Sequence, residues 1–237
     1  MAASTTPRKH FDEDILRANA VLALGRSTWP SDVALAADLL RSAVAMSVGA
    51  MDAYLCDIYV DLLVGITNAV VSKSLGRLPT DYARERLPIG ALLTSRYGSR
   101  PQWGLRMAAR EIMEKDNVLQ LRKAEQMINP GLAPSHRLWT DVIDKFVALD
   151  RKRLTAVRPR DFKSKGAMNN AQRKAAIFAL RSRISLIIQR RHDIVHNCDR
   201  PKVSPLRINP SDAAAMVADI SDFVSILDDH IQVNRLA

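Results

Sequence analysis

The sequence predicts an all-α protein, and three of its features favour this fold class. Glycine is scarce, with 9 residues among 237, and the apolar set is dominated by Ala, Leu, Ile and Val, a composition that favours helices over turn-rich β-structure. Apolar residues recur at helical spacing over long stretches. No segment shows the sustained alternation of a half-buried strand. We therefore expect a helical bundle of long antiparallel helices, each burying its apolar face against the others.

The first part of the chain is expected to form a loose tail over residues 1–11 and a helix over 12–26. The segment 29–32 (WPSD) breaks this helix and supplies an N-cap for the next one. Apolar residues then keep the helical period over 31–64, which predicts a helix of roughly 45 Å at about 1.5 Å per residue.

The middle of the chain, about 64–150, is punctuated by prolines, which interrupt helices. We expect shorter helices there, over 102–114, 117–127 and 135–151. Residues 154–170 form a basic, polar connection. A second long helix is expected over 171–196, and a last one over 211–232, with Pro210 at its boundary and Ser211 at its cap. The helices over 31–64, 171–196 and 211–232 are expected to form the core of a single domain spanning residues 1–237.

The charge of the protein is concentrated in one segment. The formal net charge is +10, and residues 151–191 hold 13 basic residues and a single acid, Asp161. Such a basic stripe is typical of proteins that bind phosphate groups, most often those of nucleic acids.

The sequence indicates a cytoplasmic protein with no membrane partner. It shows neither a secretory signal nor an apolar run of the ~20 residues that a membrane span needs. The two cysteines, Cys56 and Cys198, are far apart and are expected to be reduced. This number of cysteines excludes a structural zinc site with several cysteine ligands.

A polar segment interrupts the apolar face of the helix over 171–196. That face follows Ile177, Leu180, Ile184 and Ile187, and its next position is taken by Arg191. Buried arginine is rare unless it is paired, so Arg191 either lays its stem along apolar surface or is held by a carboxylate and aimed at a phosphate. His196 follows five residues later, about 140° around a regular helix.

The segment 190–197 (RRHDIVHN) resembles the signature of the HEPN superfamily, an arginine with a polar residue directly after it and a histidine after four to six intervening residues. Arg191 and His196 match the signature, and His192 fills the polar position. The expected helix containing residues 44–63 (VAMSVGAMDAYLCDIYVDLL) resembles the helix that precedes the catalytic one in HEPN proteins of the RiboL-PSP type. The resemblance covers roughly residues 15–232 and is weakest in the middle.

This resemblance implies a metal-independent endoribonuclease that acts on RNA as a homodimer, with Arg191 and His196 as catalytic residues at a composite cleft. No cofactor and no metal are expected. The setting implied is that of a toxin or an antiviral defence effector, with an antitoxin or another regulatory protein as a further partner. Three residues are expected to assist the site as auxiliary polar groups: His192, Asp52 and Asn197. Five basic residues are expected to bind RNA: Arg158, Arg160, Lys163, Lys165 and Arg190.

Other interpretations of the same residues stay open. A non-catalytic HEPN-like module that binds RNA or protein is the main alternative. His192 and His196 have the i, i+4 spacing of helix-borne zinc ligands, but the glutamate of the HExxH pattern is missing. His192-Asp193 also has the residues of an HD-type phosphohydrolase, for which His136 is the candidate upstream ligand. Asp52, Asp193 and Asn197 have structural explanations as a surface acid and as helix-end residues.

Overall fold

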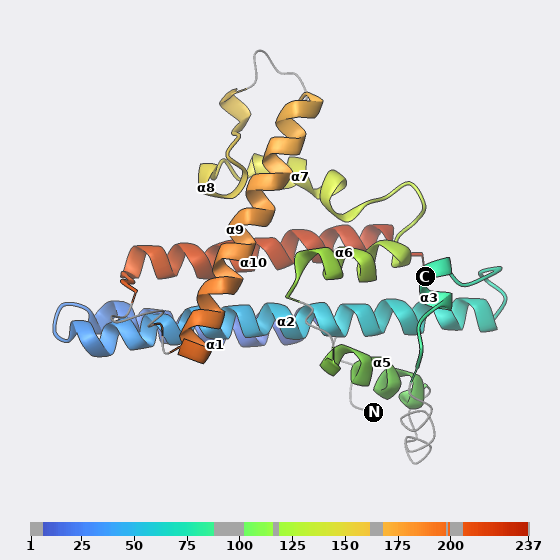
Figure 1. Ribbon diagram of the computed structural model, residues 1–237, viewed down its shortest axis with the longest axis horizontal. Coiled ribbons are helices and arrows are strands. Elements are labelled where there is room, and N and C mark those ends of the chain that lie inside the picture. Colours follow the sequence, from blue (N-terminus) through green and yellow to red (C-terminus); the bar gives the residue numbers. More distant parts are fainter. Residues whose placement is uncertain are drawn as a thin grey trace. The chain divides into compact units, whose positions relative to one another are not determined.

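The computed structural model describes residues 7–87, 102–115, 119–161, 168–197, 199 and 206–236. Within these residues the protein is all-α, as predicted, and its only β-pairing is an isolated bridge between Leu132 and Arg235. The helices are α1 (Pro7–Thr28), α2 (Val33–Val71), α3 (Thr80–Ala83), α5 (Trp103–Lys115), α6 (Leu121–Ile128), α7 (Leu138–Ala148), α8 (Lys152–Thr155), α9 (Asn170–Asn197) and α10 (Pro210–Asn234) (Figure 1). The described residues also form 3-10 turns at Asn129–Gly131 and Pro159–Asp161.

The chain divides into two compact units, each assembled from separate stretches of sequence. Unit 1 comprises Met1–Tyr54 and Val142–Asp228, and unit 2 comprises Leu55–Asp141 and Asp229–Ala237. Helices α2, α7 and α10 contribute residues to both units.

The starts of α2 and α10 lie close to the predicted positions, because their caps are local. The expected loose tail over 1–11 is wrong in its last part, since α1 already begins at Pro7, and α2 continues past the expected end at residue 64 to Val71. The Asp32 carboxylate accepts a hydrogen bond from the Leu35 N–H (2.9 Å) and caps α2. At the start of α10 the cap is Asn209, whose side-chain oxygen accepts the Asp212 N–H (2.8 Å). The expectation that Ser211 caps this helix is therefore wrong, since Ser211 already lies inside the first turn.

Unit 1 is held together by aromatic contacts between its helices. The ring of Phe11 in α1 meets Tyr54 of α2 edge-on at 6.0 Å, and the Tyr54 hydroxyl donates a hydrogen bond to Asp228 of α10 (3.0 Å). Phe146 of α7 and Phe223 of α10 lie 6.0 Å apart. Each of these rings is almost fully buried. Burial of such a side chain contributes about 1.5–3 kcal/mol to stability.

Unit 2 is organised around a close approach at Gly131. A Cβ at this position would lie 2.8 Å from the Tyr82 hydroxyl and 3.0 Å from a methyl group of Leu62, so only glycine fits. The Tyr82 hydroxyl donates a hydrogen bond to the Met127 carbonyl (2.7 Å). This contact fixes α3 against the end of α6, directly before the segment that leads into α7.

Helix α2 is more apolar than the sequence analysis allowed. An 18-residue window within it has a mean hydropathy of 1.5, which makes the helix long and apolar enough to cross a membrane by length and composition. Isolated charged residues divide this window into short charge-free runs, so that the sequence shows no uninterrupted apolar span there. Half of the window is buried within the protein, as in a core helix, so its composition is weak evidence for a membrane span.

Candidate functional site

Arg191 continues the buried face of α9. Ala176, Leu180, Ile184 and Ile187 of this helix are buried, and Arg191 follows them as a half-buried side chain. Asp52 of α2 lies close enough to respond to its charge. Burial raises the pKa of the Asp52 carboxyl, and the positive charge of Arg191 lowers it only in part, so that the pKa stays above its usual value. The Asp52 carboxyl thus lies within electrostatic reach of the Arg191 guanidinium.

The other motif residues lie on the opposite, exposed side of α9. His192, His196 and Asn197 are exposed, and the two imidazole rings lie 4.4 Å apart between centroids. The helix continues without a break to Asn197, so Arg191 and His196 remain about 140° apart around it. Within one chain the structure therefore brings Arg191 to Asp52 and leaves His196 directed elsewhere.

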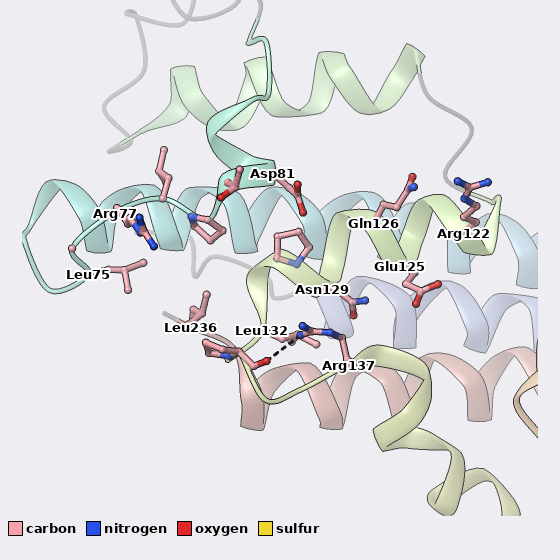
Figure 2. A pocket seen from close by; sticks show the side chains of 16 residues that line it. Leu75, Arg77, Asp81, Arg122, Glu125, Gln126, Asn129, Leu132, Arg137 and Leu236 are labelled. Atoms are coloured by element: carbon pink, nitrogen blue, oxygen red, sulfur yellow. Dashed lines mark hydrogen bonds between the residues drawn. The ribbon is translucent and has the colours of Figure 1, made fainter. Parts of the chain in front are cut away.

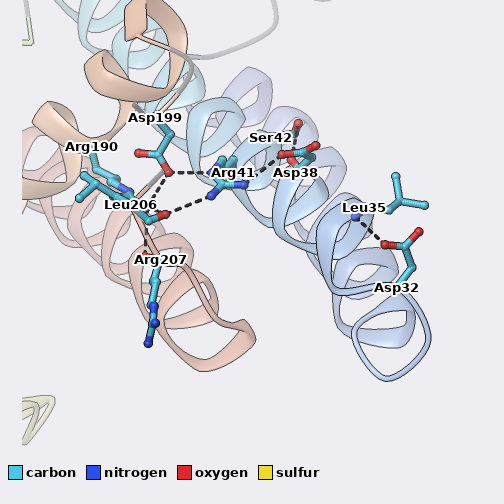
Figure 3. A network of polar contacts seen from close by, with 9 residues as sticks. All are labelled: Asp32, Leu35, Asp38, Arg41, Ser42, Arg190, Asp199, Leu206 and Arg207. Atoms are coloured by element: carbon cyan, nitrogen blue, oxygen red, sulfur yellow. Dashed lines mark hydrogen bonds and ion pairs between the residues drawn. The ribbon is translucent and has the colours of Figure 1, made fainter. Parts of the chain in front are cut away.

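Arg190, expected to bind RNA, is engaged inside unit 1 instead. Figure 3 shows its guanidinium beside Asp199, whose fully buried carboxylate it contacts at 2.7 Å. Arg41 of α2 donates to the same carboxylate oxygen at 2.7 Å, and both arginines also donate to the Leu206 carbonyl. The side chain of Arg190 is only 12% exposed. Its neighbours give it a structural role, fixing the chain that leaves α9 against α2.

Much of the basic segment is paired in the same way. The fully buried carboxylate of Asp219 in α10 accepts hydrogen bonds from Arg153 of α8 and Arg183 of α9. The contact with Arg183 joins α9 to α10 where Figure 1 shows the two helices crossing. Arg151 pairs with Asp222, and Arg173 with Asp144. The segment is therefore less available to a phosphate backbone than its charge suggests, because acids from other parts of the fold neutralise these arginines.

The remaining RNA-binding candidates lie around the 3-10 turn Pro159–Asp161. Arg160 is exposed, whereas Arg158 is half-buried and its backbone N–H donates a hydrogen bond to the Asp161 carboxylate (2.8 Å). Lys163 and Lys165 lie outside the described residues.

A second cluster of chemically active side chains, which the sequence analysis did not identify, lies in unit 2. His136, Asp141 and His230 each offer one ligand atom within 4.8 Å of the other two. His136 Nδ1 lies 3.0 Å from Asp141 Oδ2, and His230 Nε2 lies 3.9 Å from the same oxygen. The two histidines are 94 residues apart in the sequence. Only the packing of the end of α10 beside the start of α7 brings them together, so no local pattern predicts the cluster.

The electrostatics of this cluster favour an ionised carboxylate. Burial alone would raise the pKa of Asp141. The backbone N–H of Arg137, the side chains of His136 and Thr140 and the charge of His230 outweigh this and hold the pKa below its usual value. His230 itself is 4% exposed. These three residues are the ones in the described part of the chain that could hold a metal ion together.

Unit 2 also carries an open groove of about 850 Å³ (Figure 2). Leu75, Leu132 and Leu236 give it an apolar part, and Arg77, Arg122 and Arg137 bring positive charge to its walls. Asp81 and Glu125 line it as well. The mixture of charges gives the groove no clear preference for anions or cations.

Comparisons with protein-family models, with curated proteins and with solved structures found no match.

Proposed function

We propose that the protein is a metal-independent endoribonuclease of the HEPN type, in which Arg191 and His196 carry out the chemistry. The observation that carries the proposal is the position of Arg191. It replaces an apolar residue at the end of the buried face of α9 and has the carboxylate of Asp52 beside it. An arginine that only covers apolar surface needs no acidic neighbour, whereas one that contacts a phosphate benefits from a partner that orients it.

The chemistry uses the nucleophile that RNA supplies. His196, exposed at the end of α9, takes the proton from a ribose 2′-OH as this oxygen attacks the adjacent phosphorus. The bond from phosphorus to the 5′-oxygen breaks, and this oxygen takes a proton from water as it leaves, while the protonated His196 returns its proton to the solvent. Arg191 stabilises the negative charge that builds up on the phosphate oxygens. The products are a 2′,3′-cyclic phosphate and a free 5′-OH.

A second chain completes the site. Because Arg191 and His196 point about 140° apart on one helix, we infer that Arg191 of one protomer works with His196 of the other in a homodimer. Exposed basic residues such as Arg160, together with Lys163 and Lys165, bind the RNA backbone and make the affinity salt-dependent. A toxin or antiviral effector of this kind, held in check by an antitoxin or another regulatory protein, is the setting that the HEPN resemblance favours.

The test is cleavage of total RNA by the purified protein in EDTA. We expect cleavage to persist and to leave the two end groups given above. His196→Ala should lower the rate by about 10²–10⁴-fold, the usual effect of losing a general acid–base, with RNA affinity unchanged. His10→Ala, which removes a histidine of α1 outside the motif, is the matched control and should cleave normally.

Three results would overturn the proposal. These are cleavage by His196→Ala at the wild-type rate, the requirement of an added metal for cleavage while circular dichroism shows an intact fold in EDTA, and RNA binding without cleavage by the wild-type protein. The last of these would favour the non-catalytic HEPN-like module. As a separate check on binding, neutralising Arg160, Lys163 and Lys165 together should weaken RNA affinity and flatten its dependence on salt.

A further inference from the structure

We propose that His136, Asp141 and His230 form a zinc site in unit 2, separate from the residues of the proposed nuclease. The site goes beyond the ribonuclease hypothesis and does not depend on it. Two imidazoles and one carboxylate are a ligand set that zinc uses when water or another group occupies the fourth position.

The distances in the cluster suit a tetrahedral zinc ion. With bonds of about 2.0–2.1 Å, the ligand atoms around zinc lie about 3.3–3.4 Å from one another. In the structure, His136 Nδ1 and His230 Nε2 lie 3.0 and 3.9 Å from Asp141 Oδ2. All three ligand atoms fall within 4.8 Å. The distances from Asp141 Oδ2 to the two imidazole nitrogens would change by about half an ångström or less to suit one ion. The distance between the two imidazole nitrogens would change by up to about 1.5 Å.

The surroundings hold the ligands in place. The backbone N–H of Arg137 donates to Asp141 Oδ2 (3.0 Å), and the Thr140 hydroxyl donates to Oδ1 (3.1 Å). Asp141 lies in the first turn of α7, and this helix is capped by Asn129, whose side-chain oxygen accepts the Leu138 N–H (2.9 Å). His230 is buried, so its rotamer is fixed by packing. The Arg137 N–H and the Thr140 hydroxyl thus supply the hydrogen bonds that orient a carboxylate ligand on a metal ion.

Metal binding by His230 requires the neighbouring Asn234 side chain to change its orientation. Its Nδ1 lies 3.1 Å from the Asn234 amide nitrogen, which also donates to the His230 carbonyl (2.8 Å). Coordination through Nε2 places the proton on Nδ1, so the Asn234 side chain turns to present its oxygen to that proton when zinc binds. The ion thereby links the last turns of α10 to the segment that leads into α7.

The test separates this site from the exposed pair His192 and His196, whose i, i+4 spacing also attracts zinc. In the background variant His192→Gln/His196→Gln, isothermal titration calorimetry with Zn²⁺ should show one bound ion per chain. Adding His230→Gln or His136→Gln should weaken binding by at least about 100-fold, more than the loss of an outer-shell partner. Adding His10→Gln should leave it unchanged. Co²⁺ in place of zinc should give the visible absorption of a tetrahedral complex.

The experiment remains decisive if the buried His230 variant fails to fold, because His136 is 36% exposed and its removal disturbs the packing less. Circular dichroism shows which variants keep their helices. Binding that is absent from the background variant, or that survives the loss of both His136 and His230, overturns the proposal. The cluster would then be a purely structural arrangement of two imidazoles around one carboxylate.

Discussion

Asp52 illustrates how one side chain can be costly for stability and useful for chemistry. Its carboxyl group is half-buried on α2, and the nearby charge of Arg191 only partly compensates for its burial. A functional site tolerates such a group when it orients another residue. The sequence indicated both residues. Arg191 takes an apolar position on its helix, and Asp52 lies at the edge of the apolar face of the helix expected over 31–64. The loss of solvation that raises the pKa of Asp52 depends on how the helices pack, so it could not be predicted from the sequence.

The raised pKa of Asp52 predicts a pH-dependent effect of its removal. A raised folded-state pKa means that the group contributes stability below the unfolded-state value of about 3.9, and that this contribution is lost as the pH rises through the folded-state value. Asp52→Asn should therefore gain stability relative to wild type as the pH rises from about 4 through the raised pKa of Asp52. Urea unfolding at several pH values measures this difference. Asp14→Asn, on the exposed part of α1, is the control, and an equal trend in both variants would contradict the assignment.

If Asp52 orients Arg191, the same Asp52→Asn variant should lower the cleavage rate while leaving the RNA affinity unchanged. Asp52→Glu, which restores the charge, should recover part of the rate. A purely structural Asp52 would change neither quantity.

At the scale of the helices, the elements that the sequence predicted well are those with a local cause. The long helices α1, α2, α9 and α10 follow apolar periodicity, and α9 spans Asn170–Asn197, within one residue of the expected 171–196 at each end. The four-residue helices α3 and α8 were missed because one turn shows no periodicity. Helix α6 ends at Ile128, one residue past the expected end of the helix over 117–127, whereas α7 spans Leu138–Ala148 in place of the expected 135–151. The start of α7 differs because Asn129, outside the expected helix, caps it.

The ion pairs that hold these helices could not be predicted, because they join residues far apart in the sequence. The clearest case is Arg41, which contacts the buried Asp199 at 2.7 Å across 158 residues of sequence (Figure 3). The same arginine also makes a local contact, with the exposed Asp38 three residues before it, at 3.0 Å. The two acids bind the same arginine in different surroundings, and this allows a matched comparison.

Asp199→Asn should destabilise the protein by about 3–5 kcal/mol, because it leaves the guanidinium groups of Arg41 and Arg190 without their buried countercharge. Asp38→Asn should lower the free energy of unfolding by less than about 1 kcal/mol, since an exposed ion pair contributes little. Denaturant unfolding of both variants gives the two values. Similar losses would show that burial of Asp199 does not determine the strength of this contact.

At the scale of the whole molecule, the net charge overstates the number of basic side chains that are free of an acidic partner. The formal charge of +10 and its concentration in residues 151–191 follow from the sequence, but Asp144, Asp199, Asp219 and Asp222 are brought by the fold to arginines of that segment. The two proposed sites also fall in different compact units, the Arg191–His196 pair in unit 1 and the histidine cluster in unit 2. Loss of one activity without the other is therefore a meaningful outcome in the experiments above.

The divergence of Arg191 and His196 makes assembly part of the mechanism that we propose, and mixing two inactive variants tests this directly. Arg191→Gln and His196→Ala should each be inactive as homodimers. In a heterodimer, the wild-type Arg191 of one chain meets the wild-type His196 of the other at one of the two symmetric sites. Unfolding and refolding the variants together should therefore restore about a quarter of the wild-type rate, because about half of the dimers are mixed and each has one intact site. Circular dichroism confirms that both variants fold, and light scattering gives the mass of the dimer. If the mixture is as inactive as its components, both residues act from one chain, and the composite site is wrong.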